Sequence, residues 1–187
     1  ATTEIYTLSL HDALPISLAT RLPVRAVVAP SIFRHLHVRA WIEAYPDALV
    51  AGCPGLELKR PDLRWSQVLG DQPSPIWGDE IEQVYFSSRR ENEVVFFHKK
   101  SRTMITCDAL LNLGKHKSLR TRLSARLMGN TAPGFGWPER IMIRNRALAR
   151  RQIDRILEWP IERILLAHGD LVEADGREVV RRAYAWL

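Results

Sequence analysis

The chain has 187 residues, of which 46% are hydrophobic and 26% are charged, as is typical of a globular domain. No apolar run approaches the roughly 18 residues of a membrane-spanning helix, so we expect no transmembrane segment. The two cysteines, Cys53 and Cys107, are too few for a disulfide framework or a Cys-rich zinc site, and they suit a reducing cytoplasm. The formal net charge is +6.

Most of the positive charge lies between residues 115 and 155, where eleven basic side chains face two acidic ones, a net of +9. Such a basic section can bind nucleic acid, anionic lipid or an acidic ligand. The alternative is a solvated helical surface without a partner. The candidate anion-binding residues are Arg144, Arg150 and Arg151.

The first sixteen residues, ATTEIYTLSLHDALPI, do not match the pattern of the chain that follows. Read back into codons, they resemble a common sequencing-library adapter without a gap. A signal peptide is the competing interpretation, but there is no basic start, and Glu4 and Asp12 interrupt the apolar run. We therefore expect residues 1–16 to be non-native and residues 17–187 to form one N-terminally truncated domain.

The first part of this domain alternates strands with a helix. Apolar runs predict strands over 24–29 and 48–53, and helical spacing predicts a helix over 35–45 between them. This order indicates a parallel pair with a crossover helix. The stretch 54–78 is rich in Pro, Gly and Asp and predicts an ordered loop with short helical turns.

The second part begins with three closely spaced strands and continues into the basic section. We expect antiparallel strands over 81–86, 93–98 and 102–107, helices over 118–127 and 139–158, a strand over 161–167 and a closing helix over 176–187. The basic helical section thus spans residues 115–158.

Three apolar runs each end at a His or an Asp: 29–37, 103–108 and 163–170. A strand that ends at such a residue places it where loops gather and ligands converge. The candidate metal ligands are His35, Asp108 and His168, and the candidate catalytic residues are Asp108 and His168. Two imidazoles and a carboxylate suit one Zn²⁺, Fe²⁺ or Mn²⁺ with open positions for water.

Three motifs carry a resemblance to a known family, in this order: VRAVVAPSIFRHLHVRAW, EVVFFHKKSRTMITCD and RILLAHGD. Their order and spacing resemble the metallo-β-lactamase superfamily, in a branch with degenerate metal motifs. The resemblance spans residues 24–187. It implies an α/β fold, the αβ/βα sandwich of that superfamily, truncated at its N-terminus.

The chain departs from the metal motifs of the superfamily. Active members carry H-x-H-x-D-H after the first of these strands, where this chain has Ser31 and Phe33 for the first two His, Arg34 for the Asp, and His35 for the last His, with no residue between the second and third of these positions. A further His is missing before the hairpin. The resemblance implies that one metal position is lost and that His35, Asp108 and His168 correspond to the second.

Two functions remain open on this pattern. The first is a metal-dependent hydrolase with one metal and an unknown small-molecule substrate. The second is a catalytically inactive scaffold that binds an anionic partner through its basic helices. In the second, Arg34 pairs with Asp108 and substitutes for a lost metal.

Four further residues have supporting interpretations. We place His37 beside the ligands or on the surface, and Asp170 as an acceptor that orients His168, or as a loop cap. Cys107 directly precedes Asp108 in a strand, so it faces the opposite side and is expected in the core. Glu93 is a possible acid or base, although we expect it to be solvent-exposed.

Deletion of residues 1–16 tests the adapter interpretation. Because this segment has no pattern matching the domain, its removal should change the free energy of unfolding by less than about 0.5 kcal/mol. Thermal and urea unfolding of both forms measure this, and adding native upstream strands should raise stability. A large loss on deletion would contradict the interpretation.

Overall fold

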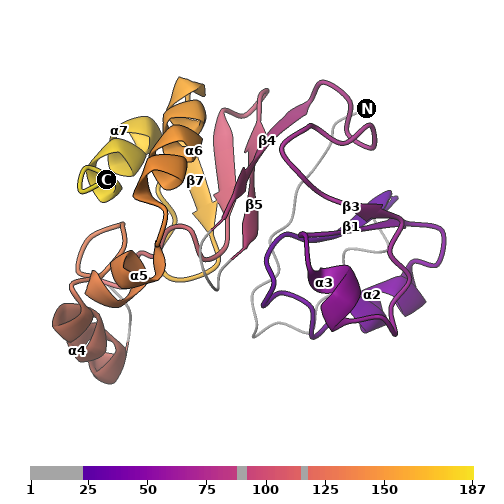
Figure 1. Ribbon diagram of the computed structural model, residues 1–187, viewed down its shortest axis with the longest axis horizontal. Coiled ribbons are helices and arrows are strands. Elements are labelled where there is room, and N and C mark those ends of the chain that lie inside the picture. Colours follow the sequence, from indigo (N-terminus) through magenta and orange to yellow (C-terminus); the bar gives the residue numbers. More distant parts are fainter. Residues whose placement is uncertain (1–22, 88–91, 115–117) are drawn as a thin grey trace.

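The computed structural model describes residues 23–87, 92–114 and 118–187 (Figure 1). Within them, two sheets and six helices form the fold. Residues 1–16, the expected non-native segment, lie outside the described residues. None of the helices in these three ranges has the length and apolar character to cross a membrane.

The first sheet is parallel and contains β1 (Ala26–Ala29), β2 (Leu49–Gly52) and β3 (Gln67–Val68) in that order. Helix α2 (Val38–Ala44) connects β1 to β2, so the predicted parallel pair with its crossover helix is confirmed. The predicted loop contains the short helix α3 (Leu56–Lys59). It also contains β3, a strand of only two residues with no buried side chain, which leaves little hydrophobic signal in the sequence.

The second sheet has the order β4 (Ile81–Phe86), β5 (Glu93–His98), β6 (Thr103–Thr106) and β7 (Arg163–Leu166). The first three are antiparallel neighbours, as predicted, and β7 pairs with β6 in parallel. The parallel pairing brings the ends of β6 and β7 to the same edge of the sheet.

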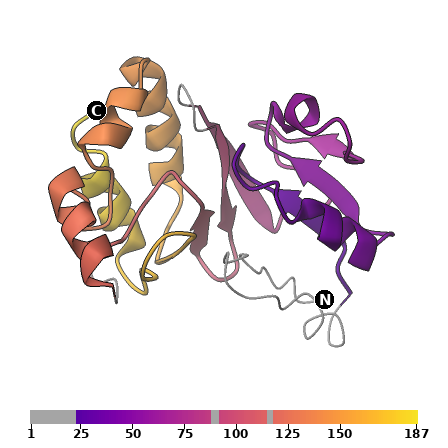
Figure 2. The ribbon, with the colours of Figure 1, turned by 90° about the horizontal axis from the view of Figure 1, so that it is seen from below.

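Helices cover the outer face of each sheet. Alternate residues of β5 belong to different cores: Val95 and Phe97 pack toward α6 (Arg146–Glu158) and α7 (Gly176–Ala183), whereas Val94 and Phe96 pack toward the first sheet. Figures 1 and 2 show α6 and α7 on one side of the second sheet and the first sheet on the other.

The outer face of the first sheet packs against α2 and α3, through Trp41 and Leu56 among others. The layers are therefore helix, sheet, sheet, helix. This is the predicted αβ/βα sandwich.

The predicted continuous helix over 139–158 is wrong. The structure has α5 (Trp137–Met142) and α6, separated by three residues. Ile143 is buried in an extended backbone conformation, and the Asn145 side chain caps α6 by accepting from the Leu148 amide at 3.0 Å. Burial of Ile143 and the Asn145 cap thus divide the predicted helix. The helix predicted over 118–127 is confirmed as α4 (Leu119–Met128), and the Ser118 side chain caps it by accepting from the Thr121 amide.

The chain after β1 joins the two sheets. Ser31 and Glu93 form an isolated antiparallel bridge. The Val94 amide donates to the Pro30 carbonyl at 2.8 Å, and the Ile32 amide donates to the Asn92 carbonyl at 3.1 Å. The turn after β1 is therefore held against the start of β5, near the ends of β6 and β7.

Candidate functional site

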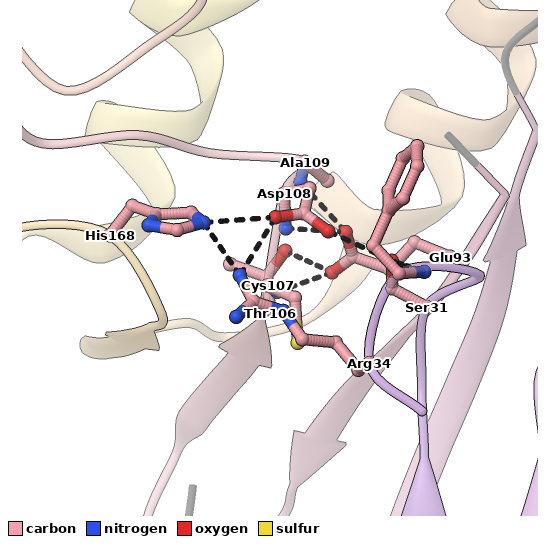
Figure 3. Close-up of polar contacts among 9 residues, drawn as sticks. Ser31, Arg34, Glu93, Thr106, Cys107, Asp108, Ala109 and His168 are labelled. Carbon is pink, nitrogen blue, oxygen red and sulfur yellow. Dashed lines mark hydrogen bonds and ion pairs between the residues drawn. The ribbon is translucent and has the colours of Figure 1, made fainter. Parts of the chain in front are cut away.

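Side chains from three chain segments meet at this junction (Figure 3). Ser31 and Arg34 come from the turn after β1, Asp108 follows β6, and His168 follows β7. The structure therefore brings together two of the three predicted metal ligands, Asp108 and His168, along with Ser31 and Arg34.

The Asp108 carboxylate is the centre of the cluster. Its Oδ2 accepts a hydrogen bond from Ser31 Oγ at 2.8 Å, and its Oδ1 accepts one from Arg34 Nη2 at 2.9 Å. His168 Nε2 lies 3.2 Å from the same Oδ1. The Arg34 and Asp108 side chains are only 16% and 14% exposed, so this ion pair is shielded from solvent on most sides. The predicted Arg34–Asp108 pair is confirmed.

Arg34 also contacts His168, with 2.6 Å between Nη2 and Nε2. A guanidinium has only donors, so a hydrogen bond from Arg34 uses the tautomer of His168 in which Nε2 accepts, whereas a hydrogen bond from His168 to Asp108 uses the form in which Nε2 donates. One nitrogen of Arg34 thus contacts both Asp108 and His168. These are two of the three predicted metal ligands.

The surroundings of Asp108 favour its charged form. Burial alone raises the pKa of Asp108, but the proximity of His168, the charge of Arg34 and the hydroxyl of Ser31 together outweigh burial. The pKa of Asp108 is consequently below its ordinary value. Asp108 is thus an anion paired with a fixed cation across the ordinary pH range.

His168 is held in place by the turn that follows it. Gly169 has a φ of +103°, and a Cβ there would lie 1.8 Å from the carbonyl oxygen of Asn112. The Asn112 amide in turn donates to the His168 carbonyl at 2.9 Å. Only glycine fits this close approach, so the backbone fixes where the imidazole is presented. The His168 side chain remains 39% exposed.

Glu93 is bonded to the turn that carries Asp108. It is 1% exposed, at the start of β5. Its Oε1 accepts from Thr106 Oγ1 at 2.6 Å and from the Cys107 amide at 2.5 Å. Its Oε2 accepts from the amides of Asp108 and Ala109 at 2.7 and 2.8 Å. Four donors therefore hold the turn that carries Asp108.

The expectation that Glu93 is solvent-exposed is wrong. Burial, together with the nearby charge of Asp108, raises the pKa of Glu93 to about 7, against the opposing effect of its hydrogen bonds. A polar residue at the start of an apolar strand is usually a surface residue, and only tertiary structure reveals the ring of donors around this one. Cys107, in contrast, is buried as predicted.

His35 faces other partners. Its Nδ1 lies 3.2 Å from Arg60 Nη1, and its carbonyl accepts from the same nitrogen at 3.1 Å. Burial and the charges of Lys59 and Arg60 lower the pKa of His35. The predicted third ligand is therefore directed to a neighbouring arginine, and no contact with Asp108 or His168 is found.

These residues do not fit a metal ion. In the parts of the chain that the structure describes, no three His, Cys, Asp or Glu side chains are grouped to hold one. Asp108 and His168 are close enough to share an ion, but Arg34 places a fixed positive charge against both. The expected set of His35, Asp108 and His168 is thus not assembled here, because Arg60 and Arg34 occupy the positions around it.

The remaining candidates lie apart from the cluster. His37 is exposed at the start of α2, and Asp170 is exposed, with its backbone bonded to Asn112. The three candidate anion-binding residues are exposed on and before α6, and Arg150 pairs with Asp154 on that helix. None of these side chains reaches Asp108 or His168.

Comparison with solved structures identifies the architecture. The chain is similar to the DIM-1 metallo-β-lactamase, with 12% identity and a TM-score of 0.53, over 87% of this chain and 68% of that one. It is similar to the Flv1 flavodiiron core from Synechocystis sp. PCC6803, with 15% identity and a TM-score of 0.59, over 91% of this chain and 45% of that one. The chain has a metallo-β-lactamase-like fold.

A metallo-β-lactamase from Hirschia baltica gives the same result, with 10% identity and a TM-score of 0.55, over 89% of this chain and 69% of that one. No protein-family model and no curated protein sequence matches the chain. At these identities the similarity concerns the fold alone. The chain spans 45% to 69% of the length of these three neighbours.

Removal of Arg34 should destabilise the metallo-β-lactamase-like domain strongly. In Arg34→Ala the mostly buried Asp108 loses its cation, which should cost about 3 kcal/mol in the free energy of unfolding. Arg39→Ala is the matched control, because its pair with Asp62 is about half exposed and should cost less than about 1 kcal/mol. Urea unfolding at neutral pH measures both, and equal losses would contradict the buried pair.

The raised pKa of Glu93 predicts a pH dependence. The pKa of Glu93 is about 7 in the folded protein and about 4.3 in the unfolded chain. Its contribution to the free energy of unfolding is therefore complete below the pKa of the unfolded chain, and it is lost as the pH rises through the pKa of the folded protein. Stability should therefore fall, on the order of 3 kcal/mol, between about pH 5 and about pH 8.

Glu93→Gln is the control for this titration, because the amide cannot ionise. The slope of unfolding free energy against pH over the same range should be shallower in Glu93→Gln than in the wild type. Identical slopes would show that other groups cause the dependence.

Proposed function

We propose that this metallo-β-lactamase-like chain is a non-catalytic scaffold, and that the Arg34–Asp108 ion pair stabilises the place that a metal holds in active members of the fold. The observation that carries this proposal is the single nitrogen of Arg34, which lies within hydrogen-bonding distance of both Asp108 and His168. A guanidinium provides charge and hydrogen bonds but no position for a water molecule to be activated. We infer a cytoplasmic protein, which the two free cysteines support.

The chemistry of the remaining donors supports the same proposal. A metal hydrolase needs open coordination positions next to a stable set of usually three protein ligands. Two of the superfamily's imidazoles are replaced by Ser31 and Phe33, and Ser31 is fully buried and donates to Asp108. Ser31 and Arg34 thus satisfy the carboxylate of Asp108 themselves.

The hydrolase with one metal is the competing function, and the 3.2 Å between His168 Nε2 and Asp108 Oδ1 is the observation that favours it. Two ligands of one ion lie at a similar separation when each bond is about 2.0–2.2 Å. The hydrolase function requires Arg34 to move away from Asp108 and His168, and His35 to turn away from Arg60. The scaffold requires neither movement.

Metal content decides between the two functions. The purified wild type, after dialysis against equimolar Zn²⁺, Fe²⁺ or Mn²⁺, should retain well below one equivalent by elemental analysis and should not hydrolyse a chromogenic β-lactam. Arg34→Asp restores the missing carboxylate and should increase Zn²⁺ retention, and a second change, His168→Ala, should remove that gain. Circular dichroism checks that each variant is folded.

One bound metal per wild-type chain, lost in both Asp108→Ala and His168→Ala, would overturn the scaffold and support the hydrolase. This result does not depend on whether Arg34→Asp folds.

A further inference from the structure

The segment between β6 and β7 carries large apolar side chains in solvent. On α4, Leu119, Leu123 and Leu127 are 71%, 62% and 73% exposed. Their four-residue spacing places them on one face of the helix. Ala125, the buried residue of α4, lies on the opposite face by the same rotation of about 100° per residue. The leucines therefore point away from the body of the protein.

Helix α5 adds two more exposed apolar side chains beside the end of α4. Trp137 and Ile141 are 59% and 71% exposed and are also four residues apart. The indole nitrogen of Trp137 donates to the Leu127 carbonyl at 3.2 Å, which joins the two helices at this point. A Cβ at Gly136 would lie 2.1 Å from the Met128 carbonyl oxygen, so the connection is close.

We call this surface the α4–α5 face; it consists of Leu119, Leu123, Leu127, Trp137 and Ile141. Figures 1 and 2 show α4 at the end of the molecule opposite the first sheet. The body of the protein thus leaves the face accessible.

Arginines flank the leucines on both sides. Because each residue of a helix is rotated by about 100° from the one before, Arg120 lies on one side of the three leucines, and Arg122 and Arg126 lie on the other. All three are exposed, and α4 contains no acidic residue. An apolar stripe between rows of cations is typical of helices that lie in the interface of an anionic bilayer.

The charges distinguish among the candidate occupants of this face. A second copy packed through the same face would bring the arginines of one chain near those of the other, because a two-fold interface pairs identical patches. Nucleic acid would meet leucines at the centre of the surface, where it needs cations or stacking groups. A bilayer accepts both, since acyl chains take the leucines and lipid phosphates take the arginines.

We propose that the α4–α5 face docks the protein on an anionic membrane surface. Leu119, Leu123 and Leu127 enter the boundary between headgroups and acyl chains, and Arg122 and Arg126 bind lipid phosphates. This rests on the proposed scaffold function and names its anionic partner as a lipid surface. The binding site is α4 and α5, rather than the arginines of α6.

Flotation with lipid vesicles tests the proposal on the full chain. The wild type should bind phosphatidylcholine vesicles that contain phosphatidylglycerol and bind weakly to pure phosphatidylcholine. Leu123→Gln with Leu127→Gln preserves helix propensity and should reduce the partition coefficient by at least about tenfold. The matched control is Leu58→Gln, because Leu58 is 82% exposed on α3, outside the face, and the change should have no effect.

A second pair of changes, Arg122→Gln with Arg126→Gln, tests the role of charge. It should weaken binding to the anionic vesicles and lower the salt dependence of that binding. Arg151→Gln on α6 is the control and should bind as the wild type does.

Three results would overturn the proposal: no binding to the anionic vesicles, equal binding by the leucine variant, or a dimer in light scattering that the leucine variant abolishes while vesicle binding is absent. Binding to single-stranded DNA in place of vesicles is a fourth result that would overturn it. The two proposals can be contradicted independently. A wild type that holds one metal and still binds vesicles contradicts the scaffold function but not the membrane docking.

Discussion

The buried carboxyl group of Glu93 is the constraint on which the site depends. It lies at the start of β5 and accepts four hydrogen bonds from the segment 106–109, so it fixes the turn that presents Asp108. The same residue bridges to Ser31 in the turn after β1. One side chain and its backbone therefore connect the chain after β1, the start of β5 and the end of β6. Without that connection Arg34 would have no fixed position relative to Asp108.

In the proposed scaffold, Arg34 supplies the positive charge at the centre of the site. A buried Asp needs a positive partner, because an unpaired carboxylate in this environment is costly. Arginine remains charged at every accessible pH, and one nitrogen of Arg34 contacts both Asp108 and His168. This pairing offsets the charge of Asp108, and in the proposed scaffold it stands in place of the open positions on which metal hydrolysis depends.

Most of the fold was predictable from the sequence, because its strands are short apolar runs bounded by turn residues and its helices have amphipathic spacing. β3 was missed because its two residues bury no side chain, and the break before α6 was missed because Ile143 looks helical until its burial is known. Asp108 and His168 were found as strand-end residues. Glu93 and the partner of His35 were not, because both depend on contacts between distant segments.

The parallel pairing of β6 with β7 has a kinetic consequence. Thr103 pairs with Arg163 in this register, so the long stretch of chain that carries the basic helices must close into a loop before β7 can join the sheet. In contrast, few residues separate β4 from β5 and β5 from β6. Closing a long loop is entropically expensive and slows folding. The hairpins should therefore form early and the arrival of β7 late. Until then Asp108 lacks its histidine neighbour, which makes docking of β7 the step that completes the electrostatic centre.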